Sequence, residues 1–145
     1  RIREAISIGM TGNGEIWDVT DYEKCRDVSG CDSFMIGRGA IAAPDLANRI
    51  KAFENGTQRP KECWADVLAM LLSYCDLMDE DGSTENHQAG RIKQWMALIR
   101  KSHTQGAACF DEIKRIRAID ELRAKLQHDM TLPEHQQQDV AIAAE

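Results

Sequence analysis

Residues 7–15 have the sequence SIGMTGNGE, an apolar run that ends in a glycine turn. Residues 32–39, with the sequence DSFMIGRG, repeat this arrangement further along the chain. The segment between them, residues 18–29, has helical character. A strand and turn, then a helix, then a second strand and turn is typical of a parallel βαβ unit. The sequence therefore predicts an α/β arrangement, with strands at residues 7–12 and 32–36.

The two glycine turns, residues 13–15 and 37–39, follow the carboxyl ends of the two expected strands. In a parallel sheet these ends lie at one edge, so the backbone N–H groups of both turns face the same space. N–H groups arranged in this way bind anions, and the loops after the last two strands of a (β/α)8 barrel form its usual phosphate site. Glycine turns also end strands for structural reasons alone, so the spacing leaves both explanations open.

The composition is typical of a soluble globular protein with one domain or two small ones. The chain has 145 residues, of which 43% are hydrophobic and 29% charged. Its net charge of −6 argues against a general binder of polyanions. No apolar run is long enough to predict a membrane span. The five cysteines are odd in number and form no C-x-x-C pair, which indicates reduced thiols in a cytoplasmic protein.

The composition changes near residue 55. Residues 45–53 have the pattern of a short amphipathic helix, and residues 54–60, ENGTQRP, have the composition of a linker. From Lys61 onward no convincing strand pattern appears. Apolar residues instead recur at steps of three and four in four segments, which predicts a helical bundle. The four expected helices span residues 60–79, 86–102, 107–117 and 120–130.

Three parts of the chain follow from this pattern. Residues 1–55 form an α/β part, and residues 60–130 form an all-α part. Residues 131–145 contain one proline, three glutamines and a weak alanine-rich patch. We expect this last segment to be a flexible tail.

Basic residues are concentrated in one part of the expected bundle. Residues 86–117 contain seven Lys or Arg residues and two acidic residues, although the whole chain is acidic. One explanation is a solvated helix face, which is common. The alternative is a surface that contacts a phosphate backbone, where each cation that neutralises a phosphate releases counterions.

The sequence predicts neither a metal site nor a catalytic group in this chain. The four histidines, at positions 87, 103, 128 and 135, lack the spacing of metal ligands. No nucleophile motif or phosphate-binding Walker sequence is present. Cys25 and Cys31 have no neighbouring His or helix N-terminus that would lower the pKa of their thiols.

Two sets of motifs resemble one known family. Residues 12–18 (GNGEIWD), 29–32 (SGCD) and 35–40 (MIGRGA) resemble the end of the barrel in bacterial tRNA-dihydrouridine synthases, which are flavoproteins. Residues 89–95 (AGRIKQW) resemble the helical domain of the C-type subfamily, which reduces uridine 16 in the tRNA D-loop. The resemblance extends over about residues 2–126, most of the chain.

This resemblance implies a fold and an activity. The fold would be the last two β/α units of an FMN-binding TIM barrel, followed by a C-terminal helical bundle that binds tRNA. Intact members are oxidoreductases that use NADPH-reduced FMN to reduce the C5–C6 bond of uridine, and a barrel cysteine donates the proton. None of the cysteines here matches that proton donor. We therefore expect the chain by itself to be inactive.

The resemblance also implies binding residues. Asn13, Gly14, Glu15, Gly37 and Arg38 match the family's FMN-contacting positions, chiefly through backbone amides on the phosphate. Three basic residues match positions that contact tRNA, and we expect them to come together through helix pairing. These residues are Arg91, Lys93 and Lys114.

A second hypothesis is a non-enzymatic helical RNA-binding module with a remnant βαβ arm. Both hypotheses include contact with tRNA, and they differ on flavin. Two departures from the subfamily weaken the match in the helical part. Lys114 stands where a related enzyme has Arg, and Leu98 replaces an aromatic residue.

Overall fold

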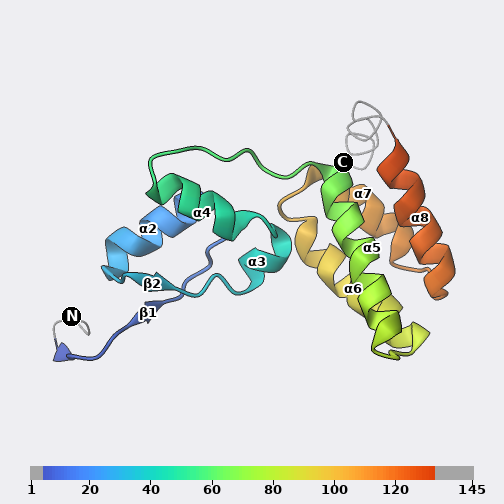
Figure 1. The fold of residues 1–145 in the computed structure, drawn as a ribbon, viewed down its shortest axis with the longest axis horizontal. Coiled ribbons are helices and arrows are strands. Elements are labelled where there is room, and N and C mark those ends of the chain that lie inside the picture. The colour runs from blue at the N-terminus through green and yellow to red at the C-terminus, as the bar shows by residue number, and fades with distance from the viewer. Residues whose placement is uncertain (1–4, 133–145) are drawn as a thin grey trace. The chain divides into compact units, whose positions relative to one another are not determined.

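The computed structural model describes residues 5–132 of the chain (Figure 1). The chain divides into two compact units, Arg1–Lys61 and Glu62–Glu145. Each unit has a hydrophobic core of its own. Of the tail expected at residues 131–145, all but the first two residues lie outside the described part.

The first unit contains a two-stranded parallel sheet, which confirms the predicted parallel pairing. Thr11 lies opposite Ser33 in the ladder, and Gly12 lies opposite Phe34. Helices separate and follow the strands along the chain. The elements in order are β1 (Thr11–Gly12), α2 (Val19–Ser29), β2 (Ser33–Phe34), α3 (Arg38–Ala42) and α4 (Leu46–Glu54).

Both strands are much shorter than the sequence predicts. Strands were expected over residues 7–12 and 32–36, but each paired segment has two residues. Within residues 5–132 the sheet consists of β1 and β2, and a two-stranded ladder is marginal in water. Ile8 and Met35, which flank the paired residues, are 75% and 55% exposed. Their apolar character predicts longer strands, but no surface of this unit covers them.

α2 lies close to its predicted bounds of residues 18–29. The Asp18 side chain accepts a hydrogen bond of 2.8 Å from the backbone N–H of Asp21 and so caps the start of the helix. Gly30 adopts the left-handed conformation that ends it. Tyr22 packs edge-on against Phe34 of β2, with ring centroids 4.9 Å apart. The helix is therefore fixed against the sheet between the two glycine turns.

α3 was not predicted from the sequence; it is a five-residue helix that begins within the second turn, at Arg38. The following helix, α4, agrees with the prediction for residues 45–53 to within one residue. Leu46 and Ile50 of α4 are buried against α2. The core of the unit consists of Ile16, Tyr22, Ala43, Leu46 and Ile50.

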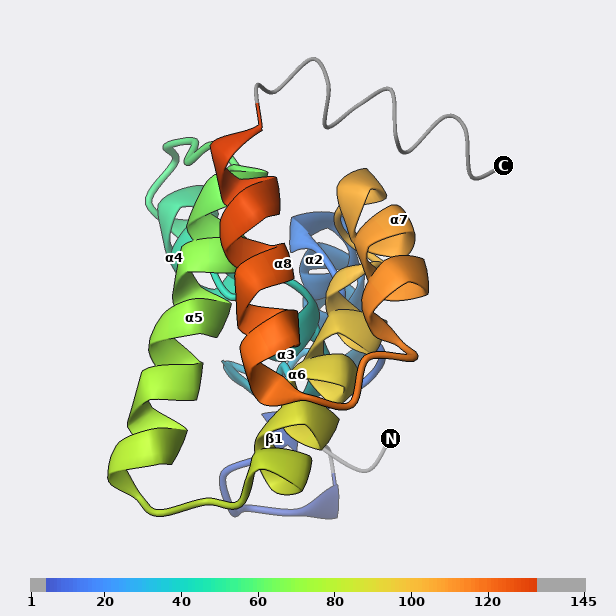
Figure 2. The same ribbon diagram turned by 90° about the vertical axis from the view of Figure 1, so that its right-hand side faces the viewer.

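The second unit is helical throughout its described residues, 62–132, as the sequence predicts. α8 packs against both α5 and α6, and α6 packs against α7 (Figure 2). No helix among residues 5–132 is long and apolar enough to span a membrane. The four helices are α5 (Trp64–Glu80), α6 (Glu85–Ile99), α7 (Thr104–Ile113) and α8 (Ile119–Thr131).

Three of these helices have bounds that differ from the prediction by at least three residues, and one of them, α6, ends at Ile99 rather than at residue 102. α5 begins at Trp64 rather than at residue 60, because Cys63 has an extended backbone and serves as the cap residue. α7 begins at Thr104 and ends at Ile113, so the predicted range of residues 107–117 was too late. Lys114 is the residue that caps the end of α7, where a cation interacts favourably with the helix dipole.

The core of the second unit is larger and better covered than that of the first. Leu71, Ile92 and Leu126 come from three different helices and are completely buried. Trp64 is buried, whereas Trp95 is only partly buried. The Trp95 ring stacks on Tyr74 of α5, with centroids 4.3 Å apart and planes 7° apart.

Candidate functional site

The structure brings the two glycine turns together at the carboxyl ends of β1 and β2. Asn13, Glu15, Gly37 and Arg38 line one hollow of about 260 Å³. Gly14, the fifth residue of the expected set, lies between two of them in the first turn. The remaining lining residues are Ile16, Trp17, Ile36 and Gly39.

Two glycines of the second turn are required by the backbone. Gly37 has φ 59° and ψ −123°, a conformation that residues with a side chain rarely adopt. A Cβ built on Gly39 would lie 1.9 Å from the carbonyl oxygen of Ile16. The close approach of Gly39 to Ile16 holds the second turn against the chain that follows the first one.

Side chains also connect the two turns. The guanidinium of Arg38 donates a hydrogen bond from Nη2 to Oε1 of Glu15, at 2.6 Å. The indole of Trp17 donates from Nε1 to Oε2 of the same carboxylate, at 2.9 Å. The Arg38 guanidinium also lies 5.5 Å from the centroid of the Trp17 ring. Sequence analysis identified Glu15 and Arg38 but gave Trp17 no role at this site.

The thiols with the most perturbed pKa values lie outside this hollow, in the second unit. Burial raises the pKa of the Cys109 thiol to about 12, and burial also raises that of Cys75. Both thiols therefore stay protonated at neutral pH and are poor nucleophiles. No group of three or more metal-ligating side chains occurs in the part of the chain that the structure describes.

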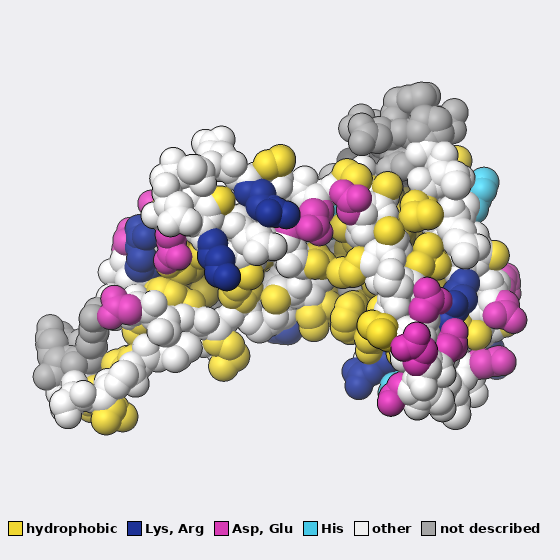
Figure 3. All heavy atoms as spheres, viewed as in Figure 1, with side chains coloured by type: hydrophobic (Ala, Val, Ile, Leu, Met, Phe, Trp, Pro, Cys, Tyr) yellow, Lys and Arg dark blue, Asp and Glu magenta, His cyan; other side chains and the backbone are white. Residues whose placement is uncertain are grey.

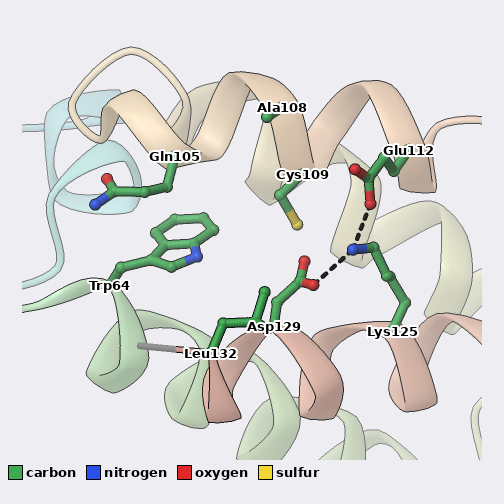
Figure 4. Close-up of a pocket in the computed structure, with 8 residues that line it drawn as sticks. All are labelled: Trp64, Gln105, Ala108, Cys109, Glu112, Lys125, Asp129 and Leu132. Carbon is green, nitrogen blue, oxygen red and sulfur yellow. Dashed lines mark hydrogen bonds and ion pairs between the residues drawn. The ribbon is translucent and has the colours of Figure 1, made fainter. Parts of the chain in front are cut away.

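A second cavity lies between the start of α5, α7 and α8, and it is small, about 50 Å³ (Figure 4). At its edge Lys125 of α8 donates to Asp129, 2.5 Å away, and forms an ion pair with Glu112 of α7. Burial lowers the pKa of Lys125, but the hydrogen bonds to both carboxylates outweigh this and raise it overall. Because the cavity has room for no more than a few water molecules, we assign this group to the packing of α7 on α8.

The basic residues expected at a tRNA surface are placed on two helices of the second unit. Arg91 and Lys93 lie on α6, and Arg91 donates a hydrogen bond of 3.3 Å to Gln94. Among the described residues neither Arg91 nor Lys93 has an ion pair. Lys114, at the end of α7, pairs with Asp111 at 2.6 Å.

Further basic residues lie near Lys114 at the end of α7. Hydrogen bonding to Lys114, with further effects of Arg100 and Arg115, lowers the pKa of Asp111. Arg100, the residue that caps the end of α6, therefore lies close enough to Asp111 to affect its carboxylate. A Cβ on Gly106 would lie 2.7 Å from Cα of Arg100, so this glycine allows α7 to turn back closely against the end of α6.

Comparison with known proteins gives one family. The family model described as dihydrouridine synthase (Dus) matches residues 1–135 of this chain. The chain is 32% identical over 123 residues to a tRNA-dihydrouridine(16) synthase of Neisseria meningitidis serogroup A, covering 85% of this chain and 37% of that protein.

Two further relatives with the same name give similar values. The protein of Yersinia pestis is 34% identical over 126 residues, which cover 87% of this chain and 38% of the relative. The protein of Escherichia coli K12 is 36% identical over 113 residues, which cover 78% of this chain and 34% of the relative. The chain thus spans little more than a third of the length of the curated relatives it matches.

Proposed function

Because this chain belongs to the dihydrouridine synthase family, we propose that it is the C-terminal portion of a tRNA-dihydrouridine(16) synthase. Residues 1–55 would be the last two β/α units of a TIM barrel, and residues 60–130 the helical tRNA-binding domain after it. The match over residues 1–135 carries this proposal. The small parallel sheet followed by four helices is compatible with it.

The FMN phosphate fits the hollow between the two glycine turns. The hollow, of about 260 Å³, has room for a phosphate group. A Cβ on Gly37 would meet no atom within 4 Å, so the backbone of this turn is open to a ligand. In this proposal Asn13, Gly14, Glu15, Gly37 and Arg38 hold the phosphate, chiefly through backbone N–H groups.

FMN, when bound, would carry a hydride from NADPH to the C5–C6 bond of uridine. The role of this chain's own residues is to bind and orient the phosphate end of the cofactor. No cysteine here corresponds to the family's proton donor, so we propose that the 145-residue chain is not active by itself. A cytoplasmic location belongs to the same proposal.

The second unit would hold tRNA through Arg91, Lys93 and Lys114. The charge distribution supports this assignment, because the basic residues within residues 86–117 form a local excess within an acidic chain. Arg91 and Lys93 have no ion pair within residues 5–132, so phosphates need not displace a carboxylate from either. Arg100 and Arg115 lie around Asp111 with Lys114 and would extend the same surface.

The alternative, a non-enzymatic RNA-binding module with a remnant βαβ arm, predicts tRNA binding without flavin binding. The sequence upstream of Arg1 separates the two hypotheses. An open reading frame that encodes six more β/α units supports the synthase. A coding sequence that begins close to Arg1 supports the binding module.

A direct test uses the longest protein that this reading frame encodes and the change Gly37→Val. A β-branched side chain at φ 59° strains the turn and blocks the approach of the backbone to a phosphate. We expect the variant to lose flavin absorbance during gel filtration. Retention of full flavin absorbance would contradict the assignment of the phosphate site. Gly82→Val is the matched control, because Gly82 also has a positive φ of 71° but lies in the second unit.

A further inference from the structure

The backbone of Glu15 has an unusual conformation that points to a role for its side chain. Its φ is 48°, and among the described residues it is the one non-glycine residue with a positive φ. Glycine or asparagine occupies such positions at lower cost, and a strained residue that persists commonly marks a functional site. At this position the side chain makes contacts that glycine could not make.

Both oxygens of the Glu15 carboxylate are used. Oε1 accepts a hydrogen bond from Arg38 and Oε2 accepts one from Trp17, at 2.6 and 2.9 Å. The Arg38 guanidinium in turn lies over the Trp17 ring. The three side chains therefore form a closed set in which each contacts the other two.

This set of side chains spans the hollow from one turn to the other. Glu15 belongs to the first turn, and Arg38 directly follows Gly37 of the second. The neighbouring contact of Gly39 with the Ile16 carbonyl fixes the backbone on the inner side of the same hollow. The separation of the two turns is thus set by a backbone contact and by a side-chain contact.

We infer that Glu15, Trp17 and Arg38 form a clamp that sets the spacing of the two glycine turns for a phosphate group, with Glu15 as the positioning residue. The inference rests on the proposed phosphate site and adds a role for side chains to it. The Glu15 side chain acts through Arg38 and Trp17, whereas its backbone N–H belongs to the proposed phosphate site. Arg38 lines the hollow and has further N–H donors besides the one bonded to Glu15.

The test compares variants of the 145-residue chain by two-dimensional amide NMR, with and without inorganic phosphate. Glu15→Gly removes the clamp and suits the positive φ, so thermal unfolding should change little. We expect phosphate to shift the Gly14, Gly37 and Gly39 amides in the unmodified chain, and Glu15→Gly to weaken its affinity about two- to fivefold, the range for exposed ion pairs. Trp17→Phe keeps the ring under Arg38 but removes one donor, so it should give a smaller loss.

Asp27→Asn is the matched control. It removes an exposed ion pair with Arg26 in the same unit, outside the two turns, and should bind phosphate as the unmodified chain does. Equal phosphate affinity of Glu15→Gly and the unmodified chain would overturn the clamp but leave the phosphate site standing.

Spectra recorded without phosphate test the clamp separately from the proposed phosphate site. If phosphate shifts no turn signal in any variant, the proposed phosphate site fails. The clamp is then decided by whether Glu15→Gly moves the Gly37 and Gly39 amides, which lie in the other turn. Movement of these signals supports the clamp, and unchanged signals overturn it.

Discussion

The two units use their apolar residues in different ways. In the second unit Leu71, Ile92 and Leu126 are completely buried among four helices. In the first unit Ile8 and Met35, beside a two-residue ladder, are largely exposed, and yellow side chains are visible near the sheet (Figure 3). The second unit therefore has the core of an independent folding unit, whereas the sheet of the first is incompletely covered. We expect stability to come mainly from the second unit and ligand geometry from the first.

Core truncation should produce the largest effect. Leu122→Ala empties a completely buried position in the second unit and should lower the free energy of unfolding by about 2–5 kcal/mol. Ile50→Ala, in the smaller core of the first unit, should cost less because its surroundings can relax more easily. Urea unfolding followed by circular dichroism measures both. Leu77→Ala is the control. Because Leu77 is 60% exposed, this substitution should change the free energy of unfolding little. Equal losses of unfolding free energy in Leu122→Ala and Ile50→Ala would contradict the expected difference in core stability between the two units.

Glycine substitution should have opposite effects in the two units. Gly39→Ala places a methyl group against the Ile16 carbonyl and should destabilise the first unit by about 1–3 kcal/mol. The methyl group added by Gly90→Ala would meet no atom within 4 Å, so this substitution should stabilise α6 by about 0.5–1 kcal/mol. Thermal unfolding of both variants provides the comparison. A Gly39→Ala variant as stable as the unmodified chain would contradict the close approach of the second turn.

Alkaline pH should weaken the second unit. Burial raises the Cys109 pKa from 9.0 to about 12, so between these values the folded state keeps a proton that the unfolded state has lost. Its contribution is fully present below pH 9 and is lost as pH rises, by about 1.4 kcal/mol per pH unit. Lys125, whose pKa is also raised, adds a loss in the same direction at higher pH. Urea unfolding at pH 8 and pH 10 measures this loss. The free energy of unfolding should fall less between the two pH values in Cys109→Ala than in the unmodified chain. An unchanged slope in that variant would show that its thiol is not the cause.

Removal of cations from α6 should alter RNA binding more than stability. The double change Arg91→Ala and Lys93→Ala should weaken tRNA binding and flatten its salt dependence by about one to two units of slope. Each exposed substitution should change stability by no more than about 0.5 kcal/mol. The matched control is Lys51→Ala with Arg59→Ala, which removes the same charge from the first unit. In a filter-binding titration, an unchanged slope in the α6 variant would favour a solvated helix face.

Patterns of neighbouring residues predicted much of this fold. The period of apolar residues identified α5, α6 and α8, and the helical character of residues 18–29 identified α2. Spacing also predicted that Asn13, Glu15, Gly37 and Arg38 would meet, because parallel strands bring their carboxyl ends to one edge.

Features that depend on contacts distant in sequence were not predictable in this way. The length of a strand depends on the strands beside it in the sheet. The apolar pattern of residues 7–12 carries no information about those strands. The position of Arg100 near Asp111 depends on how closely α7 approaches the end of α6 at Gly106. The role of Trp17 depends on its hydrogen bond to the carboxylate of Glu15, whose backbone has a positive φ. No local sequence pattern predicts such a conformation at a glutamate.

The central claim is that the two units bind different ligands, a phosphate-bearing flavin in the first and tRNA in the second. Amide NMR of the 145-residue chain, titrated separately with FMN and with tRNA, tests it most directly. FMN should shift signals of residues 13–15 and 37–39, and weakly, because in the proposed synthase the other contacts to the cofactor come from residues outside this chain. Unmodified tRNA should shift those of residues 91–93 and Lys114. The account is contradicted if FMN leaves both turns unchanged, or if tRNA leaves α6 and the end of α7 unchanged.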